Sequence, residues 1–109
     1  MIEKIILDFL NENLGVPVCL EETEEEKEYV LIEKTSGRGG FIKKSTIAIQ
    51  SCSSSLYMAA SLNDKVTEVM ETCVQLDDIT KCELNSSYNY SDTARKKYRY
   101  QAVFDIVHY

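Results

Sequence analysis

The C-terminal stretch of the chain, residues 95–109, alternates between two sets of side chains for over a dozen positions. Successive side chains of a strand point to opposite faces, so this pattern predicts one strand that is long by ordinary standards. One face of the predicted strand contains Tyr98, Tyr100, Ala102, Phe104, Ile106 and His108. The other face contains Arg99, Gln101, Val103, Asp105, Val107 and Tyr109. Such a strand needs neighbours to pair with and a second layer to cover its apolar side.

Two segments show the three-to-four-residue spacing that is typical of amphipathic helices. The first, residues 2–13, places Ile2, Ile5, Ile6, Phe9 and Leu10 on one stripe. We expect the second to run from about Leu56 to Leu76, after three serines that suit a helix start. Its predicted buried stripe is Leu56, Ala59, Ala60, Leu62, Val66, Val69, Met70 and Cys73. The side chains predicted to face water are Asn63, Asp64, Lys65, Glu68 and Glu71.

The remaining segments are typical of strands. A short extended piece spans Val16 to Leu20, and strands are predicted at Tyr29–Thr35, Lys43–Cys52 and Ile79–Tyr90. The glycine-rich residues 36–40 join two of them and predict an antiparallel hairpin. The resulting order, α-β-β-β-α-β-β, favours an α+β fold of two layers, with both helices packed on one face of an antiparallel sheet. No repeat or linker divides the chain, so residues 1–109 are interpreted as one domain.

The composition disfavours two classes of function. The 109 residues include 12 Lys and Arg against 18 Asp and Glu, a net charge of −6, whereas a nonspecific nucleic-acid binder needs a basic surface. No segment approaches the roughly 18 apolar residues of a membrane span. Acidic residues in the first helix also disfavour a signal peptide. We therefore expect neither nucleic-acid sequence recognition nor membrane insertion.

A search for catalytic or cofactor chemistry finds no constellation. The single histidine, His108, is next to last and is interpreted as an exposed imidazole at a strand end. The glycine-rich segment leads into a strand, whereas a phosphate-binding loop leads into a helix. The acidic run Glu21–Glu28 lacks the alternation and the glycine of a calcium loop. Four cysteines without close pairs are interpreted as free, buried thiols in a reducing compartment. We expect no enzyme activity, no metal and no cofactor.

Other features indicate contacts between proteins. Basic residues gather around the glycine-rich segment and again where the last strand begins, and five of the seven tyrosines lie in the last two strands. Tyrosine suits interfaces, although filling one face of a sheet explains these rings as well, and charge balance explains the basic clusters. Opposed acidic and basic patches favour head-to-tail association of identical subunits. The candidate interface residues are Arg38, Phe41, Lys43, Lys44, Arg95, Lys96, Lys97 and Arg99.

Several stretches of the chain resemble small tail proteins of long-tailed bacteriophages and prophages of Gram-positive hosts. They are Tyr29–Thr35, Ile47–Ser51, Ser55–Ala60, Leu84–Asp92 and Tyr98–Val107. The closing sequence YRYQAVFDIVHY is the most specific of them, and the tail terminator, or tail completion, family is the most similar group. The family's hairpin loop corresponds here to Ser36–Lys44, whereas we match no part of the family pattern to the acidic run Glu21–Glu28.

The resemblance implies a two-layer α+β subunit that forms a hexameric ring on the finished tail tube. The ring would stop tube polymerisation and offer a surface for the head. The implied partners are further copies of the chain, the tail tube protein and a head–tail connector protein. The implied location is the host bacterial cytoplasm during assembly and then the virion tail. Two alternatives stay open: another head–tail joining subunit of the same particle, and a small-molecule-binding or enzyme domain.

Overall fold

The computed structural model describes residues 2–38, 40 and 42–109. These residues form an α+β fold in the order α-β-β-β-α-β-β, which confirms the predicted fold class. The elements are helix α1 (Ile2–Asn13), strands β1 (Val18–Cys19), β2 (Tyr29–Arg38) and β3 (Lys43–Ser53), helix α2 (Leu56–Met70), the short 3-10 helix η1 (Cys73–Gln75), and strands β4 (Ile79–Asn89) and β5 (Tyr98–His108).

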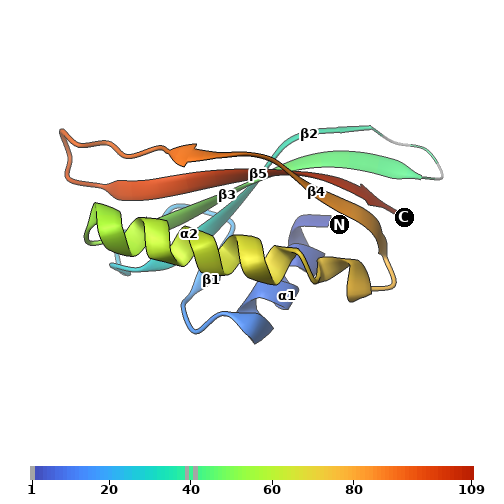
Figure 1. Cartoon of the computed structure of the whole chain (residues 1–109), viewed down its shortest axis with the longest axis horizontal. Coiled ribbons are helices and arrows are strands. Elements are labelled where there is room, and N and C mark those ends of the chain that lie inside the picture. The colour runs from blue at the N-terminus through green and yellow to red at the C-terminus, as the bar shows by residue number, and fades with distance from the viewer. Residues whose placement is uncertain (1, 39, 41) are drawn as a thin grey trace.

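The strands form one sheet in the order β1-β2-β3-β5-β4. The four long strands are antiparallel to their neighbours, and only the two-residue β1 is parallel to its partner β2 among the described residues. Both helices lie on one face of the sheet (Figure 1). The molecule is elongated, with extents of 43 × 24 × 21 Å.

The strand register places the two long hairpins at opposite ends of the molecule. Lys43 at the start of β3 pairs with His108 at the end of β5, and Ser53 at the end of β3 pairs with Tyr98 at the start of β5. The tip of the β2–β3 hairpin therefore lies at one end of the sheet and the β4–β5 connection at the other (Figure 1).

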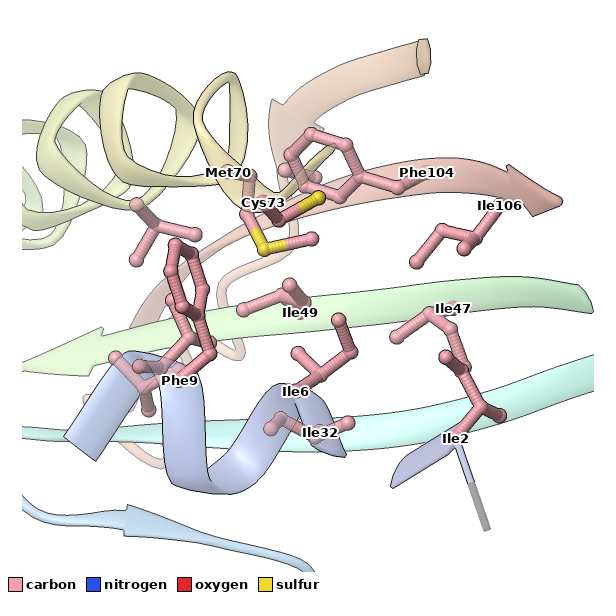
Figure 2. Close-up of a cluster of buried hydrophobic side chains, with 14 of the residues drawn as sticks. Ile2, Ile6, Phe9, Ile32, Ile47, Ile49, Met70, Cys73, Phe104 and Ile106 are labelled. Carbon is pink, nitrogen blue, oxygen red and sulfur yellow. The ribbon is translucent and has the colours of Figure 1, made fainter. Parts of the chain in front are cut away.

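The hydrophobic core fills the space between the helices and the sheet. In α1 the predicted stripe is confirmed, because Ile2, Ile6, Phe9 and Leu10 are buried. They pack with alternate residues of the strands and with the C-terminal half of α2, as Figure 2 shows. The isoleucines of β3, Ile47 and Ile49, are fully buried beneath the two helices.

The second helix is shorter than its sequence pattern predicts. It ends at Met70, where Thr72 donates its hydroxyl hydrogen to the Val69 carbonyl oxygen at 2.7 Å and the chain continues as η1. The predictions for Leu56 and Asn63 were wrong: Leu56 is 40% exposed, and Asn63 is only 4% exposed. Asn63 is buried because β4 provides a partner, with its Nδ2 donating to the Ser87 hydroxyl at 2.8 Å.

The first part of the glycine-rich segment belongs to strand β2. Strand β2 continues through Arg38, because Ser36 and Gly37 pair with Thr46 and Ser45 of β3 beyond an irregularity at Thr35. Thr35 compensates for the irregularity by donating its hydroxyl hydrogen to the Thr46 carbonyl oxygen at 3.3 Å. Gly40 has a φ of 123°, a backbone conformation that favours glycine.

We call the face of the sheet opposite the helices the outer face. The residues on it alternate along each strand with the core residues, so cross-strand neighbours form rows. One row joins Tyr29, Cys52 and Arg99, and the next joins Leu31, Gln50, Gln101 and Tyr88. The outer face therefore carries polar and aromatic side chains where the helix face carries isoleucine.

None of the helices in the described part of the chain combines the length and the apolar character needed to cross a bilayer.

Candidate functional site

The eight candidate interface residues divide between the two ends of the molecule. Lys43 and Lys44 begin β3 at the β2–β3 end and are exposed. The backbone of Arg38 ends β2 at the same place, and Phe41 lies outside the described residues. Arg95, Lys96 and Lys97 belong to the β4–β5 connection at the opposite end, and Arg99 is the second residue of β5. The structure thus does not bring the two basic clusters together.

The last strand begins at Tyr98 and not at Arg95 as predicted, because residues 92–97 form a tight reversal. We call this reversal and the first two residues of β5 the basic turn (residues 92–99). Asp92 and Lys97 exchange backbone hydrogen bonds of 2.8 and 2.9 Å, and the Arg95 amide donates to the Asp92 carboxylate at 3.3 Å. Lys96 has a φ of 57°, in the left-handed region that side chains other than glycine rarely adopt. The Arg95 side chain is 75% exposed and approaches only Asp92 among the described residues, at 3.6 Å.

The acidic loop (residues 20–28) lies against this turn within the same subunit. Glu22 Oε1 accepts a hydrogen bond from Arg99 Nη1 at 3.2 Å and lies 4.0 Å from Lys97 Nζ. A cavity of about 330 Å³ separates the two segments, lined by Glu24, Glu26 and Lys27 on one side and by Lys96, Lys97 and Arg99 on the other. Part of the charge that the sequence predicts for contacts between subunits is therefore neutralised inside one subunit.

Arg99 is the best-fixed cation of the basic turn. Its side chain is 19% exposed, and its Nε donates to the Tyr90 carbonyl oxygen at 3.0 Å. Its guanidinium carbon lies 5.3 Å from the centre of the Tyr90 ring, an arrangement that favours a cation–π contact. Tyr88 packs edge-on against Tyr90 with ring centres 6.1 Å apart. Arg99 thus holds an aromatic pair that stays partly exposed on the outer face.

A chain of side-chain hydrogen bonds orients the other end of this aromatic pair. Gln50 donates from Nε2 to Gln101 Oε1 at 3.0 Å, and Gln101 donates from its own Nε2 to the Tyr88 hydroxyl oxygen. Both glutamines are buried. The Tyr88 hydroxyl is engaged with the protein, while its ring is 42% exposed. Rings fixed in this way lose little conformational entropy on contact with a partner.

A second hollow, of about 480 Å³, lies on the outer face near the β2–β3 end. Lys44, Lys81, Glu83 and Asp105 are among the residues that line it. Asp105 accepts hydrogen bonds from Thr46 Oγ1 at 3.0 Å and from Asn85 Nδ2 at 2.9 Å, so both carboxylate oxygens are engaged. The hollow is a mixed-charge surface that suits a protein contact.

The interpretation of His108 as an exposed imidazole was wrong. His108 is 4% exposed, and its Nε2 lies 2.8 Å from the hydroxyl oxygen of Ser45, which is equally buried. Its Nδ1 lies 3.1 Å from the Tyr109 carbonyl oxygen. The imidazole is buried because β5 alternation turns it toward the helix face, beside Ile106. The one carboxylate near it in sequence, Asp105, projects from the outer face, so Ser45 and His108 serve to join β3 and β5.

The four cysteines are free thiols, of which Cys52 and Cys73 are buried and Cys19 and Cys82 are partly buried. Burial raises the pKa of the Cys52 thiol and of the adjacent Tyr29 hydroxyl. A hydrogen bond between the Cys73 and Cys82 thiols lowers the pKa of Cys73 and raises that of Cys82. In the described part of the chain, no group of three or more His, Cys, Asp or Glu side chains is arranged to hold a metal ion.

No protein-family model matches the sequence, and no curated protein is significantly similar to it. What the site can bind is therefore inferred from the arrangement of its own residues. Sequence reasoning found the basic turn but missed Glu22 and the Gln50–Gln101–Tyr88 hydrogen bonds. The alternation of side chains along β3 and β5 places Gln50 and Gln101 on the same face of the sheet. This pattern could have predicted the hydrogen bonds between them.

Proposed function

We propose that this chain is a structural subunit of a bacteriophage tail, which forms a ring at the end of the tail tube. The ring stops tube polymerisation and provides the surface to which the head is joined. The resemblance of the strand sequences and the closing YRYQAVFDIVHY to tail terminator proteins supports this proposal. Its partners are further copies of the chain, forming a hexamer, the tail tube protein and a head–tail connector protein.

The observation that carries the proposal is the separation of contact surfaces along an elongated body. Lys43 and Lys44 are exposed at one end of a 43 Å molecule, and Arg95 and Lys96 are exposed at the other. A subunit with contact residues at both ends can touch two different partners at once, as a joining part must. The exposed Tyr88 and Tyr90 rings beside Arg99 add residue types that are enriched in interface hot spots.

The basic residues at the β2–β3 end are proposed to contact a virion partner and not another part of the same subunit. Unlike Lys97 and Arg99, which approach Glu22, the Lys43 and Lys44 side chains make no ion pair within 4.0 Å among the described residues. Exposed cations of this kind steer association with an acidic partner and add specificity. The hairpin that carries them projects at the end of the sheet (Figure 1).

Removal of the gene from the phage that encodes it tests the proposed function. Loss of a tail terminator gives overlong tail tubes, which electron micrographs of the lysate measure directly. Normal-length tails without heads would assign the chain to head–tail joining instead. Normal, infectious particles would contradict both assignments.

A charge-reversal experiment tests the contact itself. The triple variant Arg38→Glu, Lys43→Glu and Lys44→Glu should fold and yet fail to complement the deletion, because three cations at one end become anions. The control is Lys65→Glu, which reverses an exposed lysine of α2 that makes no ion pair within 4.0 Å among the described residues. Wild-type plaque counts from the triple variant would contradict a contact at the β2–β3 end.

A further inference from the structure

We propose that Cys73 and Cys82 form a site of reversible oxidation, in which a disulfide bond connects η1 to β4. The inference is independent of the proposed function, because it concerns chemistry within one subunit. The two residues lie nine positions apart in sequence (82 − 73), on either side of the turn that leads from α2 into the sheet.

The thiols are brought together by the core and not by a loop. Cys73 is 0% exposed and belongs to the main hydrophobic cluster, and Cys82 packs against the same cluster. Cys82 is on the helix face of β4, because it pairs with the core residue Ile106 of β5. The Ile79 amide donates to the Leu76 carbonyl oxygen at 3.0 Å and closes the turn between them. Figure 2 shows the Cys73 sulfur inside this packed region, near Met70 and Phe104.

The pair differs from the other two cysteines in its packing, because Cys73 and Cys82 share the main hydrophobic cluster, and a hydrogen bond between their thiols shifts their pKa values in opposite directions. A disulfide requires the two Cβ atoms to lie about 3.5–4.5 Å apart, so thiols that share one packed cluster are candidates for this bond. The same hydrogen bond favours the thiolate of Cys73, and the thiolate is the form that reacts with oxidants. By contrast, Cys19 directs its thiol at the Val30 carbonyl oxygen, 3.5 Å away, and is not hydrogen-bonded to Cys52. Cys19 and Cys52 therefore serve as an internal control for Cys73 and Cys82.

The oxidant reaches the pair from the edge of the molecule. Cys82 is partly exposed, and Cys73 lies between residues 71–72 and 74–75, all of which are exposed. A peroxide is little larger than water and needs only a local opening of the three-residue η1 to contact the Cys73 sulfur.

The chemistry with hydrogen peroxide balances in two steps. The Cys73 thiolate attacks one peroxide oxygen and the O–O bond breaks; the leaving hydroxide takes a proton to become water, and Cys73 becomes a sulfenic acid. The Cys82 sulfur then attacks the Cys73 sulfur, so that the S–S bond forms and the S–O bond breaks. The departing hydroxyl group takes the Cys82 proton and leaves as water, while the proton released when the Cys73 thiolate formed was taken up by the hydroxide of the first step. The two thiols lose two electrons in total and the peroxide gains them.

The test treats the folded wild-type protein with hydrogen peroxide and then alkylates all remaining thiols under denaturing conditions. We expect the protein mass to fall by two hydrogens before alkylation and two of its four cysteines to resist alkylation. Peptide mapping should connect the peptides that contain Cys73 and Cys82. Dithiothreitol should restore four reactive thiols and reverse a rise in melting temperature.

Matched variants keep the result interpretable. The Cys19→Ser, Cys52→Ser protein should still form the intramolecular bond, whereas Cys82→Ser should not, and Cys73→Ala provides a second check if Cys82→Ser folds poorly. A bond that connects Cys19 to Cys52, bonds only between subunits, or four thiols that stay reactive would each overturn the proposal. None of these outcomes bears on tail length, so failure here is distinguishable from failure of the proposed function.

Discussion

The two halves of the helix–sheet interface differ in chemistry although the same strands build them. In one half, Ile47 and Ile49 of β3 meet Phe104 and Ile106 of β5 beneath both helices. In the other half, the same face of β3 continues with Ser51 and Ser53, opposite Tyr100 and Tyr98. We call these the isoleucine half and the serine half. The strand pairing is unbroken across both, so the difference is in side chains alone.

In the described structure, buried polar atoms of the serine half lack hydrogen-bond partners, whereas the buried Ser45 and His108 of the isoleucine half bond to each other. The hydroxyl oxygens of Ser51 and Ser53 and the Oδ1 of Asn63 are buried without a hydrogen-bond partner. Such atoms lower stability, since a buried polar group without a partner loses its interactions with water. The acidic loop, the basic turn and the exposed tyrosines all lie at this end. The comparison indicates that the isoleucine half holds the fold together, while the serine half carries the surfaces proposed for contact.

The largest expected effect is in the isoleucine half. Replacing Phe9 with Ala should reduce the free energy of unfolding by about 3–5 kcal/mol, because a buried ring is lost and a cavity remains. Phe9 is 9% exposed and belongs to the main cluster. Urea unfolding measures the change, with the exposed Asn11→Ala on the same helix as the control. A loss below about 1 kcal/mol would mean that α1 contributes little to the core.

Alkaline pH should weaken the packing of Tyr29 against Cys52 on the outer face, at the same end of the sheet as the serine half. Burial raises the pKa of Cys52 from an ordinary 9.0 and that of Tyr29 from an ordinary 10.0. Above these values the unfolded chain has lost protons that the folded chain retains. The contribution of these two groups to the free energy of unfolding is therefore fully present below about pH 9 and falls as the pH rises.

The variant Tyr29→Phe isolates the contribution of one of these groups. Above pH 10 the free energy of unfolding of the wild type should fall more steeply than that of the variant, by up to about 1.4 kcal/mol per pH unit. Urea unfolding at a series of pH values from 8 to 11 measures both slopes. Parallel slopes would show that the Tyr29 hydroxyl titrates alike in the folded and unfolded chains.

The sequence predicted the architecture well because periodicity reports which face of an element is buried. The long alternation through Phe104 and Ile106 and the stripe of α1 are confirmed for this reason. The same reasoning failed at Asn63 and His108, because their burial depends on Ser87 and Ser45, distant partners that no local pattern reveals. For the candidate site, the basic turn was found from composition, whereas its contact with Glu22 required the path of the acidic loop in three dimensions.

A smaller effect is expected in the basic turn. Lys96 has a φ of 57°, so Lys96→Gly should stabilise the protein by about 0.5–1 kcal/mol, as relief of strain outweighs the extra freedom of glycine in the unfolded chain. Lys96→Ala removes the same charge without relieving the backbone and should show no gain. Thermal unfolding compares the two variants. An equal gain in both would assign the effect to charge repulsion among Arg95, Lys96 and Lys97.

The smallest expected effect is at Ser51, and it directly tests the difference between the serine half and the isoleucine half. Ser51 is 0% exposed, and its hydroxyl has no partner in the described structure. Because removal of an unpaired hydroxyl costs little, Ser51→Ala should change the free energy of unfolding by less than about 0.5 kcal/mol. Ile49→Ala, two positions earlier on the same face, should lose about 2–5 kcal/mol. A loss above about 1 kcal/mol at Ser51 would mean that a buried water satisfies its hydroxyl, and the serine half would then be a hydrated part of the core and not a weak one.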